Sequence, residues 1–216
     1  MPKTRHFVAF DLDGTLVDSA PDIASAANDT LAEFGGAPIA LAEIRRMIGD
    51  GAPKLMERAL AASGLSVELA TVMPRFVQHY DAHATSLVKP YPGVVTTLAQ
   101  LAEAGYQLGV CTNKPYNATL MVLRYCGLAD FFGAVVGGDS LPQRKPDAEP
   151  LLATIAQLGG TVDQSVMVGD SATDLATAVA AKVPALIIPS GYGMEEVEAT
   201  PGFNSFADLT QLLAAL

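Results

Sequence analysis

The sequence is poor in basic residues. Thirteen Lys and Arg stand against 23 Asp and Glu in 216 residues, which gives a formal net charge of −10 and a pI of about 4.6. A chain this acidic has no general electrostatic attraction for nucleic acid, so we expect no nucleic-acid partner. A site for an anionic substrate must then be made positive locally, by a metal ion or a few lysines.

Cysteine and long apolar runs are also scarce. Cys111 and Cys126 lie in apolar surroundings, which is typical of core thiols and not of a disulfide framework, and this favours a reducing compartment. No apolar run approaches the ~18 residues of a transmembrane helix. The apolar stretch 7–10 is followed at once by an acid, so it is no signal-peptide core. We expect a cytoplasmic protein without a membrane partner, as a monomer or a homodimer.

Two nucleotide-binding loops and one zinc motif are missing. The sequence has no G-x-x-x-x-G-K-[ST], and no G-x-G-x-x-G follows a strand, which argues against kinase-like and dinucleotide-binding functions. His79 and His83 are four residues apart, but the glutamate of H-E-x-x-H is absent. A solvated or packed histidine pair is the simpler interpretation.

What the sequence does contain is a hydrophobic content of 50%, enough for a real core, and an alternation of elements. After a strand at 6–10, only helices are predicted, at 19–34, 41–48, 52–62 and 66–84, the last kinked or split by Pro74. Strands at 106–111, 134–136, 165–168 and 185–188 then alternate with helices at 94–104, 116–126, 147–158, 171–182 and 206–216. This predicts an α/β fold, a doubly wound parallel sheet (1–15 and 86–216) interrupted by a helical insertion (16–85).

Acidic residues gather at the predicted strand ends. Asp11 and Asp13 follow the first strand, and Asp170 and Asp174 follow a later one. Such ends meet at one edge of a parallel sheet, and carboxylates without cysteine or imidazole suit a hard ion, above all Mg²⁺. Each pair alone could be an ordinary turn or helix cap, but both together favour a site.

Uncharged and basic groups accompany these acids. Thr112 and Asn113 end a third strand and could donate to anionic oxygens. Lys145 precedes a helix, where its ammonium could hold a phosphate.

The four segments resemble the motifs of the haloacid-dehalogenase superfamily, in the same order and at strand ends. They are Phe10-Asp11-Leu12-Asp13-Gly14-Thr15-Leu16, Thr112-Asn113, Lys145 and Gly169-Asp170-Ser171-Ala172-Thr173-Asp174. The resemblance implies a Rossmannoid core with strand order 5-4-1-2-3 and a type-1 helical cap.

It also implies roles in phosphate-ester hydrolysis. Asp11 would be the nucleophile that becomes an aspartyl phosphate, and Asp13 would protonate the leaving oxygen and then activate water. Thr112 and Lys145 would hold the phosphoryl group, with Gly14 and Asn113 beside it. Mg²⁺ would be held by Asp11, the backbone carbonyl of Asp13, and Asp170, with Asp174 positioning a metal-bound water or ligand.

Within the superfamily, three stretches resemble the bacterial phosphoglycolate phosphatases: 45–52, 137–146 and 191–193. The first would be a cap loop whose Gly51 lets the backbone approach the substrate, while Arg46 or Lys54 meets a small carboxylate. Ala148 and Lys182 depart from the family pattern, where proline and glycine are usual. A phosphatase for another small phosphate, such as an amino-sugar phosphate or pyrophosphate, and a phosphosugar mutase remain alternatives.

Overall fold

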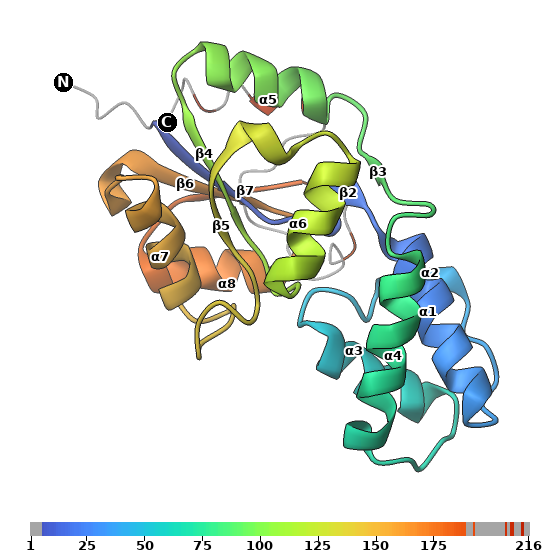
Figure 1. Ribbon diagram of the computed structural model, residues 1–216. Coiled ribbons are helices and arrows are strands. Elements are labelled where there is room, and N and C mark those ends of the chain that lie inside the picture. Colours follow the sequence, from blue (N-terminus) through green and yellow to red (C-terminus); the bar gives the residue numbers. More distant parts are fainter. Residues whose placement is uncertain (1–5, 189–191, 193–205, 207, 210–212, 214–216) are drawn as a thin grey trace.

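A five-stranded parallel sheet forms the centre of the computed structural model, which describes residues 6–188, 192, 206, 208–209 and 213 (Figure 1). The strands lie in the order β5-β4-β1-β6-β7. Counted along the chain without the short β2 and β3, this is the predicted order 5-4-1-2-3 in reverse. The strands are β1 (Phe7–Phe10), β4 (Gln107–Cys111), β5 (Phe132–Val136), β6 (Ser165–Gly169) and β7 (Ala185–Ile187).

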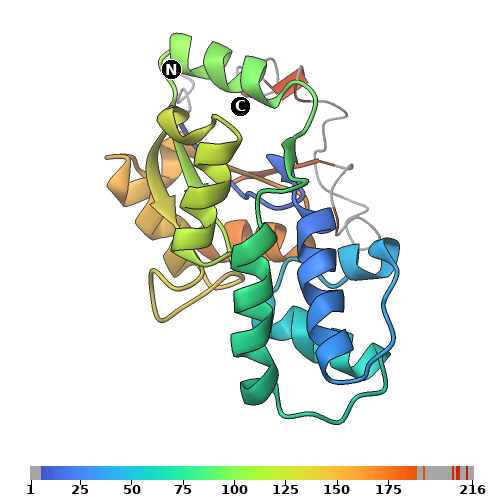
Figure 2. The same cartoon turned by 45° about the vertical axis from the view of Figure 1, so that its right-hand side comes forward.

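Helices cover both faces of this sheet because successive strand residues point to opposite sides. Val8 and Phe10 of β1 are fully buried in one hydrophobic cluster, whereas Ala9 between them belongs to another. On the first face lie α5 (Val94–Glu103) and α6 (Tyr116–Tyr125), and on the second lie α7 (Glu149–Gln157) and α8 (Ala172–Ala181) (Figures 1 and 2). Two 3₁₀ turns, η1 (Ala129–Phe131) and η2 (Val162–Gln164), precede β5 and β6.

Four helices between β2 and β3 form a separate unit with its own hydrophobic cluster, hereafter the helical unit (residues 20–83). They are α1 (Ala20–Glu33), α2 (Leu41–Arg45), α3 (Ala52–Ala62) and α4 (Leu69–His83), and α1 lies beside α4 (Figure 2). Of the kink or split expected at Pro74, the split is wrong, since α4 continues through this residue. Burial of Val72, Phe76 and Tyr80 on one side of α4 compensates the backbone hydrogen bond that proline removes.

The expectation of no strand within 16–85 is also wrong. The two-residue strands β2 (Val17–Asp18) and β3 (Lys89–Pro90) pair antiparallel where the chain leaves and re-enters the core. A strand this short has no periodic pattern that a sequence could display. The buried carboxylate of Asp22 fastens the same junction, because it accepts hydrogen bonds from the backbone N–H groups of Leu87 and Val88, each at 2.9 Å.

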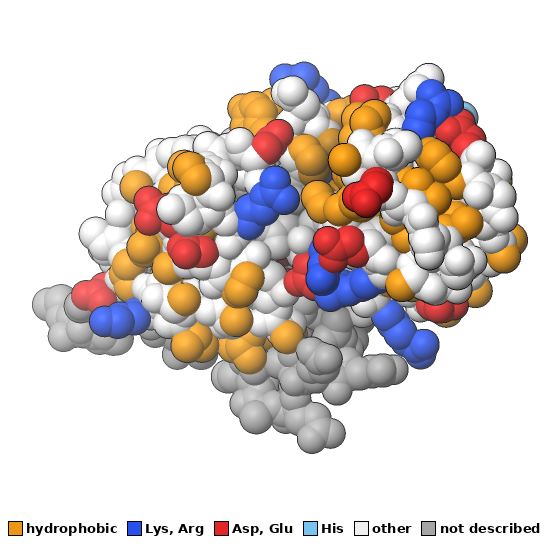
Figure 3. All heavy atoms as spheres, turned by 90° about the horizontal axis from the view of Figure 1, so that it is seen from below, with side chains coloured by type: hydrophobic (Ala, Val, Ile, Leu, Met, Phe, Trp, Pro, Cys, Tyr) orange, Lys and Arg blue, Asp and Glu red, His pale blue; other side chains and the backbone are white. Residues whose placement is uncertain are grey.

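The other helix boundaries differ from the predicted ones by a few residues, and most of the predicted helix 206–216 lies outside the described residues. Among the helices that the structure describes, none is both long and apolar enough to cross a bilayer. Acidic and basic side chains are interspersed over the face of the molecule seen in Figure 3.

Candidate active site

The candidate site lies at the carboxyl ends of three neighbouring strands. Asp11 directly follows β1, Thr112 follows β4 and Asp170 follows β6, and β1 is the strand between the other two. The three residues are buried, with 5%, 3% and 2% of their surfaces exposed. The sheet therefore brings together groups from positions 11, 112 and 170, as the strand-end pattern predicts.

Three carboxylates and one lysine form the buried centre of this site. Asp11, Asp170 and Asp174 each offer an oxygen within 4.8 Å of the others. The ammonium of Lys145 lies 2.9 Å from Asp11 Oδ1 and 2.6 Å from Asp174 Oδ1. Asp174 is held in place as the last member of a capping box on α8, where its Oδ2 accepts from the Ser171 backbone N–H and hydroxyl.

Burial and the charges of neighbouring acids disfavour the charged forms of Asp11 and Asp170. Burial raises the pKa of Asp11 to about 6, although Lys145 acts in the opposite direction. Burial, and then the charges of Asp174 and Asp11, raise the pKa of Asp170 well above its usual value. Burial alone would lower the pKa of Lys145, but Asp11 and Asp174 outweigh it and raise that pKa.

The residues present fit a divalent cation. Asp11, Asp170 and Asp174 supply only oxygen donors, which hard cations prefer. Three carboxylates against one ammonium also leave a net negative charge in a buried place, and a cation would compensate it.

The orientation of Asp170 is fixed from two sides. The Thr15 hydroxyl donates to Asp170 Oδ1 at 2.8 Å, and the Tyr192 backbone N–H donates to Asp170 Oδ2 at 2.7 Å. Gly14 lies directly against this carboxylate, with φ of +88°, and a Cβ there would come within 2.3 Å of Asp170 Oδ2. Glycine at position 14 is thus required by both its backbone angle and its neighbour.

The carboxylate of Asp13 is not part of the three-acid cluster and has partners of its own. Lys114 Nζ lies 3.0 Å from both Asp13 oxygens, and the Ser19 hydroxyl donates to Asp13 Oδ1. Lys114 is buried, with 7% of its surface exposed. Burial would lower its pKa, yet the charge of Asp13 raises it. The side chain of Asp13 thus has a charge partner of its own, separate from Lys145.

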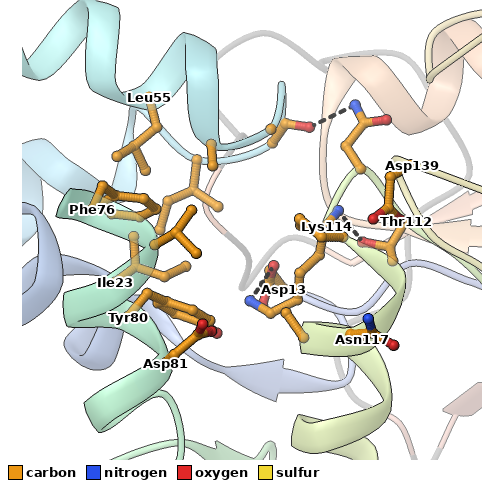
Figure 4. A pocket seen from close by; sticks show the side chains of 18 of the residues that line it. Asp13, Ile23, Leu55, Phe76, Tyr80, Asp81, Thr112, Lys114, Asn117 and Asp139 are labelled. Carbon is orange, nitrogen blue, oxygen red and sulfur yellow. Dashed lines mark hydrogen bonds and ion pairs between the residues drawn. The ribbon is translucent and has the colours of Figure 1, made fainter. Parts of the chain in front are cut away.

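A cavity of about 290 Å³ opens beside this site, between the core and the helical unit (Figure 4). Asp11, Asp13 and Thr112 line it from the core, and Ile23, Leu55, Phe76 and Tyr80 line it from the helical unit. Hydrogen bonds also join the core to the helical unit near this cavity. Asn113 Nδ2 donates to the Gly49 carbonyl at 3.1 Å, and the Thr173 hydroxyl donates to Asp50 Oδ1 at 3.0 Å.

The predicted residues of the 45–54 segment separate into two groups. Gly51 lines the cavity with φ of +89°, and a Cβ there would be 3.5 Å from the Asn113 carbonyl oxygen. Arg46 and Lys54 are exposed and outside the cavity wall, and Lys54 pairs with Glu57 at 2.7 Å. The structure does not bring these two basic residues to the site.

Asn113 lines the cavity, as its expected place beside the substrate requires, and its side chain has partners of its own. Its amide nitrogen donates to the carbonyls of Gly49 and Lys145, at 3.1 and 3.0 Å. The residue therefore connects the helical unit to the backbone of the site lysine.

The site acids also contact residues to which sequence reasoning assigned no role, among them Thr15, Ser19 and Lys114. Thr15 and Lys114 are adjacent to predicted residues, and that adjacency was the available signal. The burial of Lys114 and its pairing with Asp13, 101 positions away, are visible only in the folded chain.

Comparisons with known proteins agree on one family. The model for haloacid dehalogenase-like hydrolases matches residues 8–188. The phosphoglycolate phosphatase of Cereibacter sphaeroides strain ATCC 17029 is 46% identical over 208 residues, covering 95% of this chain and 94% of that protein. The Rhodospirillum rubrum phosphoglycolate phosphatase is 46% identical over 219 residues, covering 98% of this chain and 90% of that protein. The crystal structure of a predicted phosphoglycolate phosphatase from Haemophilus somnus 129PT matches with a TM-score of 0.91, at 29% identity, covering 97% and 98%.

Proposed function

The chain belongs to the haloacid dehalogenase-like hydrolases, and on that premise we propose that it is a Mg²⁺-dependent phosphomonoesterase that hydrolyses 2-phosphoglycolate to glycolate and inorganic phosphate. The observation that carries the reaction class is the buried cluster of Asp11, Asp170 and Asp174 around Lys145. The substrate comes from the relatives of 46% identity.

In this proposal Asp11 is the nucleophile. One of its carboxylate oxygens attacks the phosphorus in line with the ester oxygen, the ester bond breaks, and the phosphoryl group moves to Asp11 as an aspartyl phosphate. Lys145, at 2.9 Å from Asp11 Oδ1, supplies the positive charge that offsets repulsion between two anions. Thr112, on the cavity wall, holds the phosphoryl group by its hydroxyl.

Asp13 is the general acid and base. Glycolate leaves with a proton from Asp13, and the resulting carboxylate then takes a proton from a water molecule that attacks the aspartyl phosphate. That second attack breaks the P–O bond to Asp11, releases inorganic phosphate and restores Asp11. Ser19 and Lys114 orient the Asp13 carboxylate for this exchange, because both contact it directly.

Asp11, Asp170 and the backbone carbonyl of Asp13 would hold Mg²⁺, with Asp174 as the residue that orients its surroundings. When bound, the ion neutralises the phosphate oxygens and the acidic cluster as a Lewis acid.

We further propose that residues 16–85 act as a cap. The loop at 49–51 lies over Asn113, and the contacts Asn113–Gly49 and Thr173–Asp50 would break on opening. The chain passes from the core to the helical unit at β2 and returns at β3. These two strands pair with each other, and the buried Asp22 carboxylate accepts a hydrogen bond beside them. This junction would act as the hinge. Closure excludes bulk water from the first step.

The test is the release of inorganic phosphate from a panel of substrates with Mg²⁺. The panel holds 2-phosphoglycolate, an amino-sugar phosphate, a hexose phosphate and pyrophosphate, ranked by kcat/KM. The highest value for 2-phosphoglycolate supports the proposal. A rearranged sugar phosphate without net phosphate release would point to a mutase instead. Asp11→Asn is expected to stop turnover while its circular dichroism spectrum stays unchanged.

Two further parts of the proposal concern the setting. The free thiols Cys111 and Cys126 are compatible with a cytoplasmic location. Sedimentation of the purified protein distinguishes the monomer from the homodimer.

A further inference from the structure

The described cavity wall offers few positive charges for a substrate with two anionic ends. Phosphoglycolate carries a phosphate and a carboxylate, and each needs a positive partner when it leaves water. The helical unit contributes apolar side chains and one acid, Asp81, to the described part of the wall. Among the described residues that line the cavity, Lys114 is the single basic one.

The chemistry of the substrate places its carboxylate near Asp13. In phosphoglycolate a single methylene separates the ester oxygen from the carboxylate. Asp13 is the group proposed to protonate that ester oxygen, so the residue that binds the carboxylate must lie next to Asp13. Lys114 meets this requirement, since its ammonium is 3.0 Å from both Asp13 oxygens. Arg46 and Lys54, outside the wall, do not.

Lys114 has capacity for another anion. An ammonium has three N–H donors, and the two Asp13 oxygens account for two hydrogen bonds. The same nitrogen lies 4.8 Å from the centre of the Tyr80 ring and also interacts with the Tyr80 hydroxyl, which lines the cavity from the helical unit. In Figure 4 Tyr80 extends from α4 toward Asp13 and Lys114.

The hydroxyl of Tyr80, beside the same ammonium, is a second sign of a ligand. Tyr80 is buried, with 7% of its surface exposed, and its hydroxyl oxygen, although near Lys114, has no hydrogen-bond partner at normal distance in the described part of the chain. A buried hydroxyl without a partner is unfavourable, and a carboxylate that accepts its hydrogen would relieve this.

We propose that the ammonium of Lys114 and the hydroxyl of Tyr80 together bind the carboxylate of the substrate, an inference that rests on the proposed phosphoglycolate activity. The pair reads the carboxylate from both sides of the cavity, one group from the core and one from the helical unit. This pair, hereafter the anchor, is complete only when the helical unit lies against the core. Binding of the carboxylate is therefore coupled to closure of the cap.

The experiment compares 2-phosphoglycolate with ethyl phosphate, in which a methyl group replaces the carboxylate. The value measured is the ratio of kcat/KM for the two substrates, in the Mg²⁺-supplied wild type and in three variants. Lys114→Met removes the charge, Tyr80→Phe removes only the hydroxyl, and Lys54→Met removes the same charge from a lysine outside the cavity wall. Titration calorimetry with 2-phosphoglycolate, in the Asp11→Asn background, measures binding without turnover.

The wild type is expected to prefer 2-phosphoglycolate. Lys114→Met lowers kcat/KM for both substrates because Asp13 loses its partner, but the ratio falls by a further factor of about 10 to 150. Tyr80→Phe lowers the ratio about 2- to 10-fold, chiefly through KM. Lys54→Met leaves the ratio unchanged, and the binding constants in the Asp11→Asn background follow the same order.

Two contrary results are distinguishable. Suppose the wild type prefers 2-phosphoglycolate, but Lys114→Met lowers kcat/KM for both substrates equally or Tyr80→Phe leaves their ratio unchanged. The anchor is then refuted and the proposed function stands. If the wild type shows no preference for the carboxylate, the phosphoglycolate proposal fails, and the anchor fails with it.

Discussion

Removal of the metal ion is expected to make the stability of this protein depend on pH in an unusual direction. Asp11 has a pKa raised from 3.8 to about 6 because it is buried, and only 5% of its surface is exposed. Below about pH 4 this carboxyl is protonated in both the folded and the unfolded chain, so its burial carries no charge penalty. Between about pH 4 and pH 6 the folded state holds more of the proton, and the free energy of unfolding falls as the pH rises.

The size of the effect follows from the pKa. A shift from 3.8 to about 6 corresponds to about 3 kcal/mol of lost stability at neutral pH. Asp170 adds to this loss in the same direction, since its pKa is also raised by burial. Above about pH 6 the loss of unfolding free energy that Asp11 causes is complete.

The assay is urea unfolding, followed by circular dichroism at several pH values from about 4 to 7, with a chelator and with Mg²⁺. Asp11→Asn is the control, because an amide cannot titrate. With chelator, the variant is expected to be more stable than the wild type at neutral pH by about 3 kcal/mol and to match it near pH 4. Mg²⁺ stabilises the wild type more than the variant, which lacks one of the proposed ligands.

The reasoning is refuted if the metal-free wild type keeps the same free energy of unfolding across this range, or becomes more stable as the pH rises. It is also refuted if Asp11→Asn follows the wild-type pH profile, since the titrating group would then be elsewhere. Glu33, with a pKa lowered to about 2 by its hydrogen bond to Arg75, is common to both proteins and cancels in their difference.

Three further substitutions test separate parts of the site and fold. Gly14→Ala is expected to weaken Mg²⁺ binding by about 10-fold or more in titration calorimetry, because the added Cβ would displace Asp170. Gly105→Ala is the matched control and should bind Mg²⁺ normally, since Gly105 has a similar φ of +87° but no atom within 4 Å of the added Cβ. Lys145→Met is expected to destabilise the metal-free protein by about 3 to 5 kcal/mol, since it leaves Asp11 unpaired, and an unchanged melting temperature in calorimetry would contradict the charge argument. Lys182→Gly is expected to stabilise the protein by about 0.5 to 1 kcal/mol, because Lys182 ends α8 with φ of 58°, whereas Lys182→Ala should give no such gain in urea unfolding.

The strand-end motifs made much of this protein predictable. The strands β1, β4 and β6 each end at a polar residue, and parallel strands align those ends at one edge, so local pattern alone predicts Asp11, Thr112 and Asp170 together. The family, the sheet order and the insertion of helices after the first strand followed from the same motifs, and the family and the order are confirmed. Lys182, which departs from the glycine of the family pattern, adopts the left-handed conformation that glycine usually takes.

The helical unit was harder to predict because its contribution depends on contacts between distant residues. Arg46 and Lys54 were plausible carboxylate ligands by charge, but which face of a short helix meets the core is a matter of packing. The continuity of α4 through Pro74 likewise depends on burial of one face of that helix.

The sequence by itself determined the family, the parallel core and the acids that carry the proposed reaction, because these depend on residue type and on local order along strands. The tertiary structure decided which charges meet. Lys145 faces Asp11 and Asp174, whereas Lys114 faces Asp13 and the ring of Tyr80. Lys145 is a predicted site residue, and Lys114 directly follows the predicted Thr112-Asn113 pair. The partners of each lysine lie far away in the sequence. Those ion pairs therefore exist only once the segments of the chain have packed together.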